Sequence, residues 1–147
     1  MNISLPDNSP RRADVIADIL KNYKTIAVVG LSSRPTRPSF GVTQYMQSAG
    51  YRIVPVNPNE TEVLGEKSYP RLEDIPPSQH IEIVDIFRRS ENVPAVVDSA
   101  IKIGAKAIWM QQGIASPAAA AKARAAGLLV VEDACILIEH RQRFHPG

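Results

Sequence analysis

Short apolar runs alternate along the chain with longer segments in which apolar residues recur at helical spacing. Five of the runs have the length and composition of buried β-strands. These runs are Ile26–Val29, Tyr51–Val56, Ile81–Ile86, Ala107–Met110 and Leu128–Val131. Alternation of strands with helices is typical of a parallel sheet covered on both faces. We therefore predict an α/β fold: a doubly wound, mostly parallel five-stranded Rossmann-like sheet with helices on both faces.

Capping signals mark the helices between these strands. Ser9-Pro10 and Ser116-Pro117 each place a capping serine before a proline at the first helical position. Ser39 and Ser90 are expected to cap the second and third helices, and glycines follow the expected helix ends. Residues 57–80 are expected to be mostly loop, with one helical turn at Leu72–Ile75, and a short tail is expected after residue 131. Numbered along the chain, the expected strand order is 3-2-1-4-5.

Composition narrows the class of protein. The chain has 147 residues, 44% of them hydrophobic, which is ordinary for one globular domain spanning 1–147. A net charge of +2 and the lack of a basic stripe argue against nucleic-acid binding. No apolar run approaches the length of a membrane span. The N-terminus has no apolar core of a signal peptide, so we expect a cytoplasmic protein.

The segment from residue 25 to 41 has the layout of a nucleotide phosphate site. Gly30 ends the first strand, a polar loop with Arg34 and Arg37 follows, and Ser39 stands where the next helix begins. Ser32 and Pro35 occupy the positions of the second and third glycines of a dinucleotide fingerprint. The loop therefore predicts a phosphorylated nucleotide other than ordinary NAD.

Polar residues also follow the other predicted strands. Asn57 stands where a classical NAD site has Asp or Glu, which argues against NAD but leaves an NADP-type site open. Arg88 and Arg89 follow the third strand. Taken singly, such arginines are usually solvated surface charges. Beside Arg34 and Arg37, they favour a site for several phosphates, because the guanidinium group binds two phosphate oxygens at once.

We identify no catalytic or metal-binding set of residues. His80 precedes the third strand, and His140 and His145 fall in the expected tail. Cys135 is the only cysteine, which excludes an internal disulfide. Because acidic residues lie near it, we expect an inert thiol in the core.

Five motifs resemble the small CoA-binding domain proteins, single-domain relatives of the nucleotide-binding domain of the succinyl-CoA synthetase α-subunit. The motifs are Val28-Val29-Gly30-x-Ser32-x-x-Pro35-x-Arg37-Pro38-Ser39, Pro55-Val56-Asn57-Pro58, Leu64-Gly65-Glu66, Val84-Asp85-Ile86-Phe87-Arg88-Arg89 and Trp109-x-Gln111-x-Gly113-Ile114. The resemblance runs from about residue 11 to 142. It implies a Rossmann-like fold with coenzyme A along the carboxyl edge of the sheet.

The resemblance also implies roles for individual residues. Gly30, Ser32, Ser33 and Arg37 would meet the phosphates of CoA, beside the helix start at Ser39. Asn57, Pro58 and Phe87 would line the nucleotide, with Arg88 or Arg89 nearby. Gln111 and Gly113 would border the pantetheine path. Ala134 stands where the family often has an arginine, and we expect no counterpart of the ligase half of a synthetase subunit.

These departures favour binding over catalysis. We therefore expect a non-catalytic CoA or acyl-CoA binding protein, a sensor or a carrier. The alternative is an enzyme, either an NADP-type oxidoreductase or one that uses acyl-CoA. The sequence names no protein partner.

Overall fold

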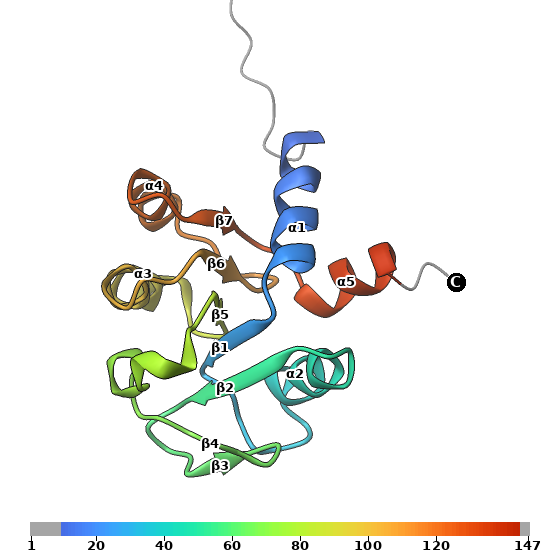
Figure 1. Cartoon of the computed structure of the whole chain (residues 1–147), viewed down its shortest axis with the longest axis vertical. Helices are drawn as coiled ribbons and strands as arrows, with labels where there is room; N and C mark the ends of the chain where they lie inside the picture. Colours follow the sequence, from blue (N-terminus) through green and yellow to red (C-terminus); the bar gives the residue numbers. More distant parts are fainter. Residues whose placement is uncertain (1–9, 145–147) are drawn as a thin grey trace, which may run out of the picture.

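A five-stranded parallel sheet forms the centre of the computed structural model, which describes residues 10–144 (Figure 1). Every pair of neighbouring strands in this sheet runs parallel. The strands are β1 (Thr25–Val29), β2 (Arg52–Val56), β5 (Ile83–Ile86), β6 (Ala107–Met110) and β7 (Leu129–Val131). All five predicted strands are therefore confirmed to within two residues, and so is the Rossmann-like fold class.

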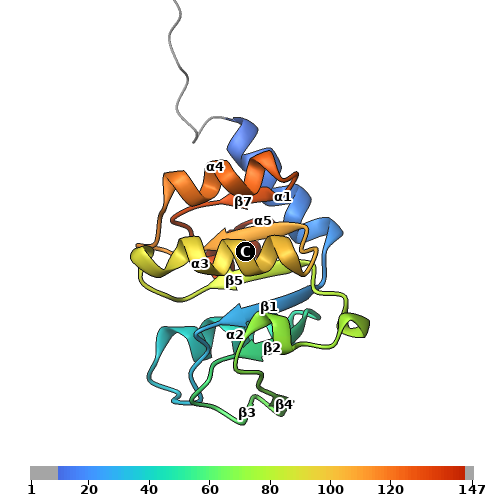
Figure 2. The same cartoon turned by 90° about the vertical axis from the view of Figure 1, so that its left-hand side faces the viewer.

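The helices cover both faces of the sheet, as Figures 1 and 2 show. One face carries α1 (Pro10–Asn22), α2 (Pro38–Ser48) and α5 (Ile136–Phe144), and its core includes Ile19, Met46 and Trp109. The other face carries α3 (Val93–Lys102) and α4 (Pro117–Ala125), whose alanines pack against β-branched residues of the strands. Burial of these two apolar layers is the main favourable term that holds the sheet and helices together.

The expected strand order is wrong. The observed order is β2-β1-β5-β6-β7, so the third long strand pairs with β1 rather than with β2. Pro55 gives the physical reason. Arg52 N–H and Val56 C=O both bond toward β1, so Pro55 faces the opposite edge of β2, where its C=O accepts the Tyr69 N–H. Proline has no N–H for a second long neighbour and is confined to edge strands.

The connection after β2 contains more structure than predicted. The helical turn expected there is confirmed as the 3-10 helix η1 (Leu72–Asp74), and a second one, η2, covers Pro77–Gln79. Two short antiparallel strands, β3 (Glu62–Val63) and β4 (Glu66–Lys67), pair as a hairpin. This connection lies along the free edge of β2, through the bridge between Val56 and Tyr69.

Two of the expected helix caps are wrong. Ser116 caps α4 by accepting the Ala119 N–H, as predicted, whereas Ser9 lies outside the described residues. Helix α2 begins at Pro38 with Arg37 as its N-cap and has no side-chain cap, because the Ser39 hydroxyl oxygen accepts the Ser32 N–H instead. Ser90 begins the 3-10 helix η3 (Ser90–Asn92) rather than capping α3, and its hydroxyl accepts the Ala115 N–H.

The prediction of a tail after β7 is also wrong, because this segment forms α5.

Candidate functional site

Gly30 makes the turn that leaves β1 at the carboxyl edge of the sheet. Its φ angle is +89°, a left-handed conformation that favours glycine. A Cβ atom at this position would lie 2.9 Å from the Phe87 carbonyl oxygen, too close for any other residue. The Gly30 N–H donates to Val56 C=O at 2.8 Å. The loop between β1 and α2 is thus held against both neighbouring strands.

Hydrogen bonds within the loop fix its shape. The Ser32 N–H donates to the Ser39 hydroxyl oxygen at 3.0 Å, and the Arg34 N–H donates to the Ser32 hydroxyl oxygen at 3.0 Å. The Arg37 N–H donates to Arg34 C=O at 3.0 Å, which leads the chain into α2. A preformed loop at the start of a helix favours anions, because the positive end of the helix dipole lies there.

Asn57 braces this loop from the end of β2. Its side-chain Nδ2 donates to Leu31 C=O at 3.0 Å, while its Oδ1 accepts the Asn59 N–H at 2.9 Å. Both ends of the amide are therefore used within the protein. Three residues further on, the Glu60 carboxylate accepts the Ser33 N–H at 2.8 Å. The sequence does not predict Glu60 as a site residue, because Glu60 lies beyond the residues directly at the strand end.

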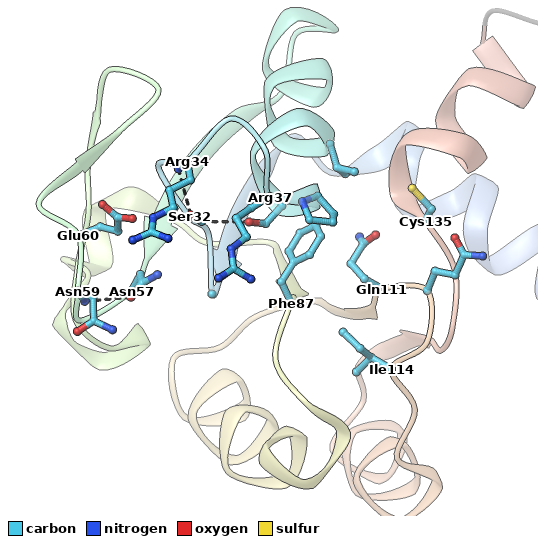
Figure 3. A pocket seen from close by; sticks show the side chains of 15 residues that line it. Ser32, Arg34, Arg37, Asn57, Asn59, Glu60, Phe87, Gln111, Ile114 and Cys135 are labelled. Carbon is cyan, nitrogen blue, oxygen red and sulfur yellow. Dashed lines mark hydrogen bonds between the residues drawn. The ribbon is translucent and has the colours of Figure 1, made fainter.

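An open cavity of about 770 Å³ lies between these loops and the ends of β5 and β6 (Figure 3). Seven of the twelve predicted binding residues line it: Gly30, Ser32, Arg37, Ser39, Asn57, Phe87 and Gln111. Eight further residues complete the lining: Arg34, Pro38, Val42, Asn59, Glu60, Gln112, Ile114 and Cys135. Figure 3 shows Glu60, Asn57 and Arg34 at one end of the cavity, Phe87 near its middle and Cys135 at the opposite end.

The other five predicted residues lie outside the lining. Ser33 and Pro58 are exposed on the two loops, and Arg89 is the N-cap of η3. Arg88 lines a separate cavity of about 340 Å³ on the α3 side of the sheet. The Gly113 N–H donates to Asp133 Oδ1 at 2.7 Å. Arg88 therefore lines a different cavity from the two arginines of the β1–α2 loop.

Arg34 and Arg37 are exposed cations at the cavity. Each of the three ion pairs within residues 10–144 joins other residues, so neither guanidinium group forms an ion pair with a described carboxylate. Charge-assisted bonds from such groups to phosphate are stronger than neutral hydrogen bonds. This end of the cavity is thus electrostatically suited to a polyanion.

Buried hydrogen bonds hold the Gln111 side chain in the wall of the cavity. The Gln111 Nε2 donates to Asp85 Oδ1 at 2.5 Å, and the Gln111 Oε1 accepts the Ile136 N–H at 3.3 Å. Asp85 is 2% exposed and Gln111 is 4% exposed. Burial raises the pKa of Asp85 to about 7, against the opposing effect of the Gln111 hydrogen bond. The Gln111 amide consequently has a fixed orientation.

The expectation of a core thiol at Cys135 is wrong. Cys135 is half-buried and lines the cavity, just before the first residue of α5. Between the end of β7, at the carboxyl edge of the sheet, and the start of α5 at Ile136 the chain turns at Asp133, whose φ angle is +54°, and Cys135 comes to line the cavity. Sequence patterns alone did not show this turn.

His140 has a structural environment within α5. Its ring is 5% exposed, its Nδ1 lies 2.8 Å from the Tyr45 hydroxyl oxygen, and it stacks on Phe144. These contacts fasten α5 to α2 away from the cavity. His145 lies outside the described residues. Among residues 10–144 no group of three His, Cys, Asp or Glu side chains is placed to hold a metal ion, and no helix is long and apolar enough to cross a membrane.

Known proteins with similar sequences share this arrangement of strands and helices. A family model described as a CoA binding domain matches residues 24–141. The uncharacterized protein YneT of Bacillus subtilis is 42% identical over 132 residues, which cover 90% of this chain and 96% of that protein. The solved structure of a hypothetical protein from Pyrococcus horikoshii OT3 is 40% identical, with a TM-score of 0.86 over 97% of this chain and 98% of that chain.

A larger enzyme contains a similar unit. The apo structure of acetyl-coenzyme A synthetase 1 from Ca. Korarchaeum cryptofilum is 27% identical, with a TM-score of 0.66. The match covers 78% of this chain but only 27% of the enzyme. Since the family model spans most of the sequence, from residue 24 to residue 141, the chain belongs to the CoA-binding-domain family, as its motifs indicated.

Proposed function

We propose that this protein binds coenzyme A or an acyl-CoA in the cavity at the carboxyl edge of the sheet and acts as a sensor or carrier rather than as a catalyst. The observation that carries the proposal is the pair of arginines without an ion pair, Arg34 and Arg37, in a preformed loop at the start of α2. Such a loop suits a diphosphate group.

The shape of the cavity supports an elongated ligand. In the proposed complex the phosphates lie against Ser32, Arg34 and Arg37, and the adenosine lies toward Asn57 and Phe87. The pantetheine arm extends along Gln111 toward Cys135, at the opposite end of the lining. Arginines at one end and a mixed apolar and amide wall at the other match the two halves of CoA.

The side chains of the lining support binding without catalysis. The hydroxyl oxygens of Ser32 and Ser39 each accept a backbone N–H group, and among the described residues neither hydroxyl donates a hydrogen bond to a base. Within residues 10–144, no hydrogen bond joins Cys135 to a base. A nucleophile without a positioned base is not activated for acyl transfer.

Native mass spectrometry of the protein as purified tests the proposal. We expect a ligand-bound species whose added mass is that of CoA or an acyl-CoA, released on denaturation. The protein stripped of ligand should regain that mass when CoA is added. A protein that takes up NADP but not CoA under the same conditions would refute the proposal and favour the oxidoreductase alternative.

A further inference from the structure

Glu60 is a carboxylate inside a site whose other features favour anions. It lines the same cavity as Arg34 and Arg37, but it forms no ion pair with either guanidinium group within the described residues. Its Oε2 accepts the Ser33 N–H at 2.8 Å instead. A carboxylate oxygen on a loop N–H has the position and charge that a phosphate oxygen takes at such a loop.

The backbone around Glu60 directs the carboxylate to this place. The Glu60 N–H donates to Asn57 C=O at 3.2 Å, and the Asn59 N–H donates to Asn57 Oδ1 at 2.9 Å, which forms a tight turn after β2. Asn57 is itself bonded to Leu31 C=O at the start of the β1–α2 loop. Hydrogen bonds therefore join the turn after β2 to the β1–α2 loop, and the Glu60 side chain reaches from the turn to the loop.

We propose that Glu60 is a competing anion: its carboxylate occupies the Ser33 N–H in the empty protein and is displaced when a phosphate of the ligand binds there. The inference rests on the proposed function and adds a specificity determinant to it. A ligand must carry an anionic group that binds the Ser33 N–H more tightly than the Glu60 carboxylate does. The same group must also interact with Arg34 and Arg37. Uncharged ligands that fit the cavity gain nothing from this exchange.

The exposure of the charged groups explains why Glu60 does not block the phosphate position permanently. Glu60 is half-buried and Arg34 and Arg37 are exposed, so water screens their attraction. Glu60 forms a single hydrogen bond with the Ser33 N–H, whereas a diphosphate offers several oxygens to the loop and to the two arginines and therefore outcompetes one carboxylate. The displaced carboxylate then moves into solvent, where it is well hydrated.

The test compares Glu60→Ala and Glu60→Gln with the wild-type protein by calorimetric titration. The probes are CoA, inorganic pyrophosphate and pantetheine, which has no phosphate. We expect CoA and pyrophosphate to bind Glu60→Ala about three- to tenfold more tightly, the effect of removing one exposed hydrogen-bonded competitor. Glu60→Gln should gain less, because its side-chain oxygen still accepts the Ser33 N–H. Pantetheine affinity should not change.

Glu62→Ala is the matched control, since Glu62 is an exposed glutamate two residues away that does not line the cavity. Weaker CoA binding by Glu60→Ala would show that Glu60 holds the ligand, and equal affinities would show that it is idle; either result overturns the inference. If neither variant nor wild type binds CoA but pyrophosphate still prefers Glu60→Ala, the CoA proposal fails and the role of Glu60 stands. If pyrophosphate and CoA both fail to bind Glu60→Ala, both proposals are refuted.

Discussion

The Gln111 side-chain amide donates a 2.5 Å hydrogen bond to the buried carboxyl group of Asp85. The other end of the same amide accepts the Ile136 N–H at the start of α5. A residue of the cavity wall is thereby joined both to the centre of the sheet and to the helix that follows Cys135. The stability of the fold and the shape of the cavity are consequently coupled at Gln111.

The raised pKa of Asp85 predicts a pH dependence of stability. Its folded value of about 7 lies above the ordinary value of 3.8, because the buried site disfavours the charged form. The protonated carboxyl group therefore stabilises the fold fully below pH 4, and this contribution is lost as the pH rises through 7. The free energy of unfolding should fall by at most about 1.4 kcal/mol per pH unit in that window.

Asp85→Asn should remove this dependence, since its side chain does not titrate. Between pH 5 and pH 8, thermal melts should shift progressively in favour of the variant relative to wild type. Asp18→Asn, at an exposed position on α1, controls for the charge change. A difference in melting temperature between Asp85→Asn and wild type that stays constant with pH would contradict the assignment.

Gly30→Ala separates backbone strain from a steric clash. Both Gly30 and Gly104 have positive φ angles, +89° and +80°, so alanine at either position should cost about 1–2 kcal/mol. Only Gly30 has a backbone carbonyl, that of Phe87, within 3.0 Å of the added Cβ atom. Denaturant unfolding should therefore show a larger loss for Gly30→Ala than for Gly104→Ala, and equal losses would indicate that the loop moves freely.

Arg37→Ala should weaken CoA binding without weakening the fold. Loss of one charge-assisted bond, worth about 1.5–3 kcal/mol, reduces affinity about tenfold or more. The melting temperature without ligand should hardly change, because the Arg37 side chain is exposed. The hydrogen bonds that Arg37 forms at the start of α2 come from its backbone, which the substitution keeps. Arg141→Ala, an exposed arginine on α5 outside the cavity, is the control. Unchanged affinity would mean that Arg37 is a solvated surface charge.

Cys135 gives a direct probe of where the ligand lies. It is the only cysteine of the chain and lines the cavity, so thiol labelling reports on one position. We expect a thiol reagent to label the native protein, and saturating CoA to slow the labelling severalfold by covering the sulfur. Labelling that is equally fast with and without CoA would place the pantetheine arm elsewhere.

Local patterns predicted the elements of this fold better than their arrangement. The strands were evident because apolar β-branched runs have few other stable states. The strand order depends on Pro55, whose missing N–H marks β2 as an edge strand. Helix α5 has no capping residue before Ile136, and its start is fixed by the distant Gln111 side chain.

The same distinction holds for the candidate site. Gly30 and Arg37 were predicted because a strand, a glycine and a loop lie consecutively in the sequence. Glu60 and Cys135 reach the cavity through a turn after β2 and a reversal after β7, which no short pattern describes. Arg88 follows a neighbouring strand, which predicts a place beside the phosphate loop, yet it lines a separate cavity with residues of α3. After a strand ends, the packing of the surrounding elements decides on which face of the sheet a residue lies.

The central claim is that the cavity selects CoA over a dinucleotide. Calorimetric titration of the ligand-free protein with CoA and with NAD, at one moderate salt concentration, tests it most directly. The account predicts tighter binding of CoA, because Arg34 and Arg37 offer charge to its phosphates and Asn57 stands where an NAD site has an acidic residue for the ribose. NAD binding as tight as that of CoA, or tighter, would contradict it.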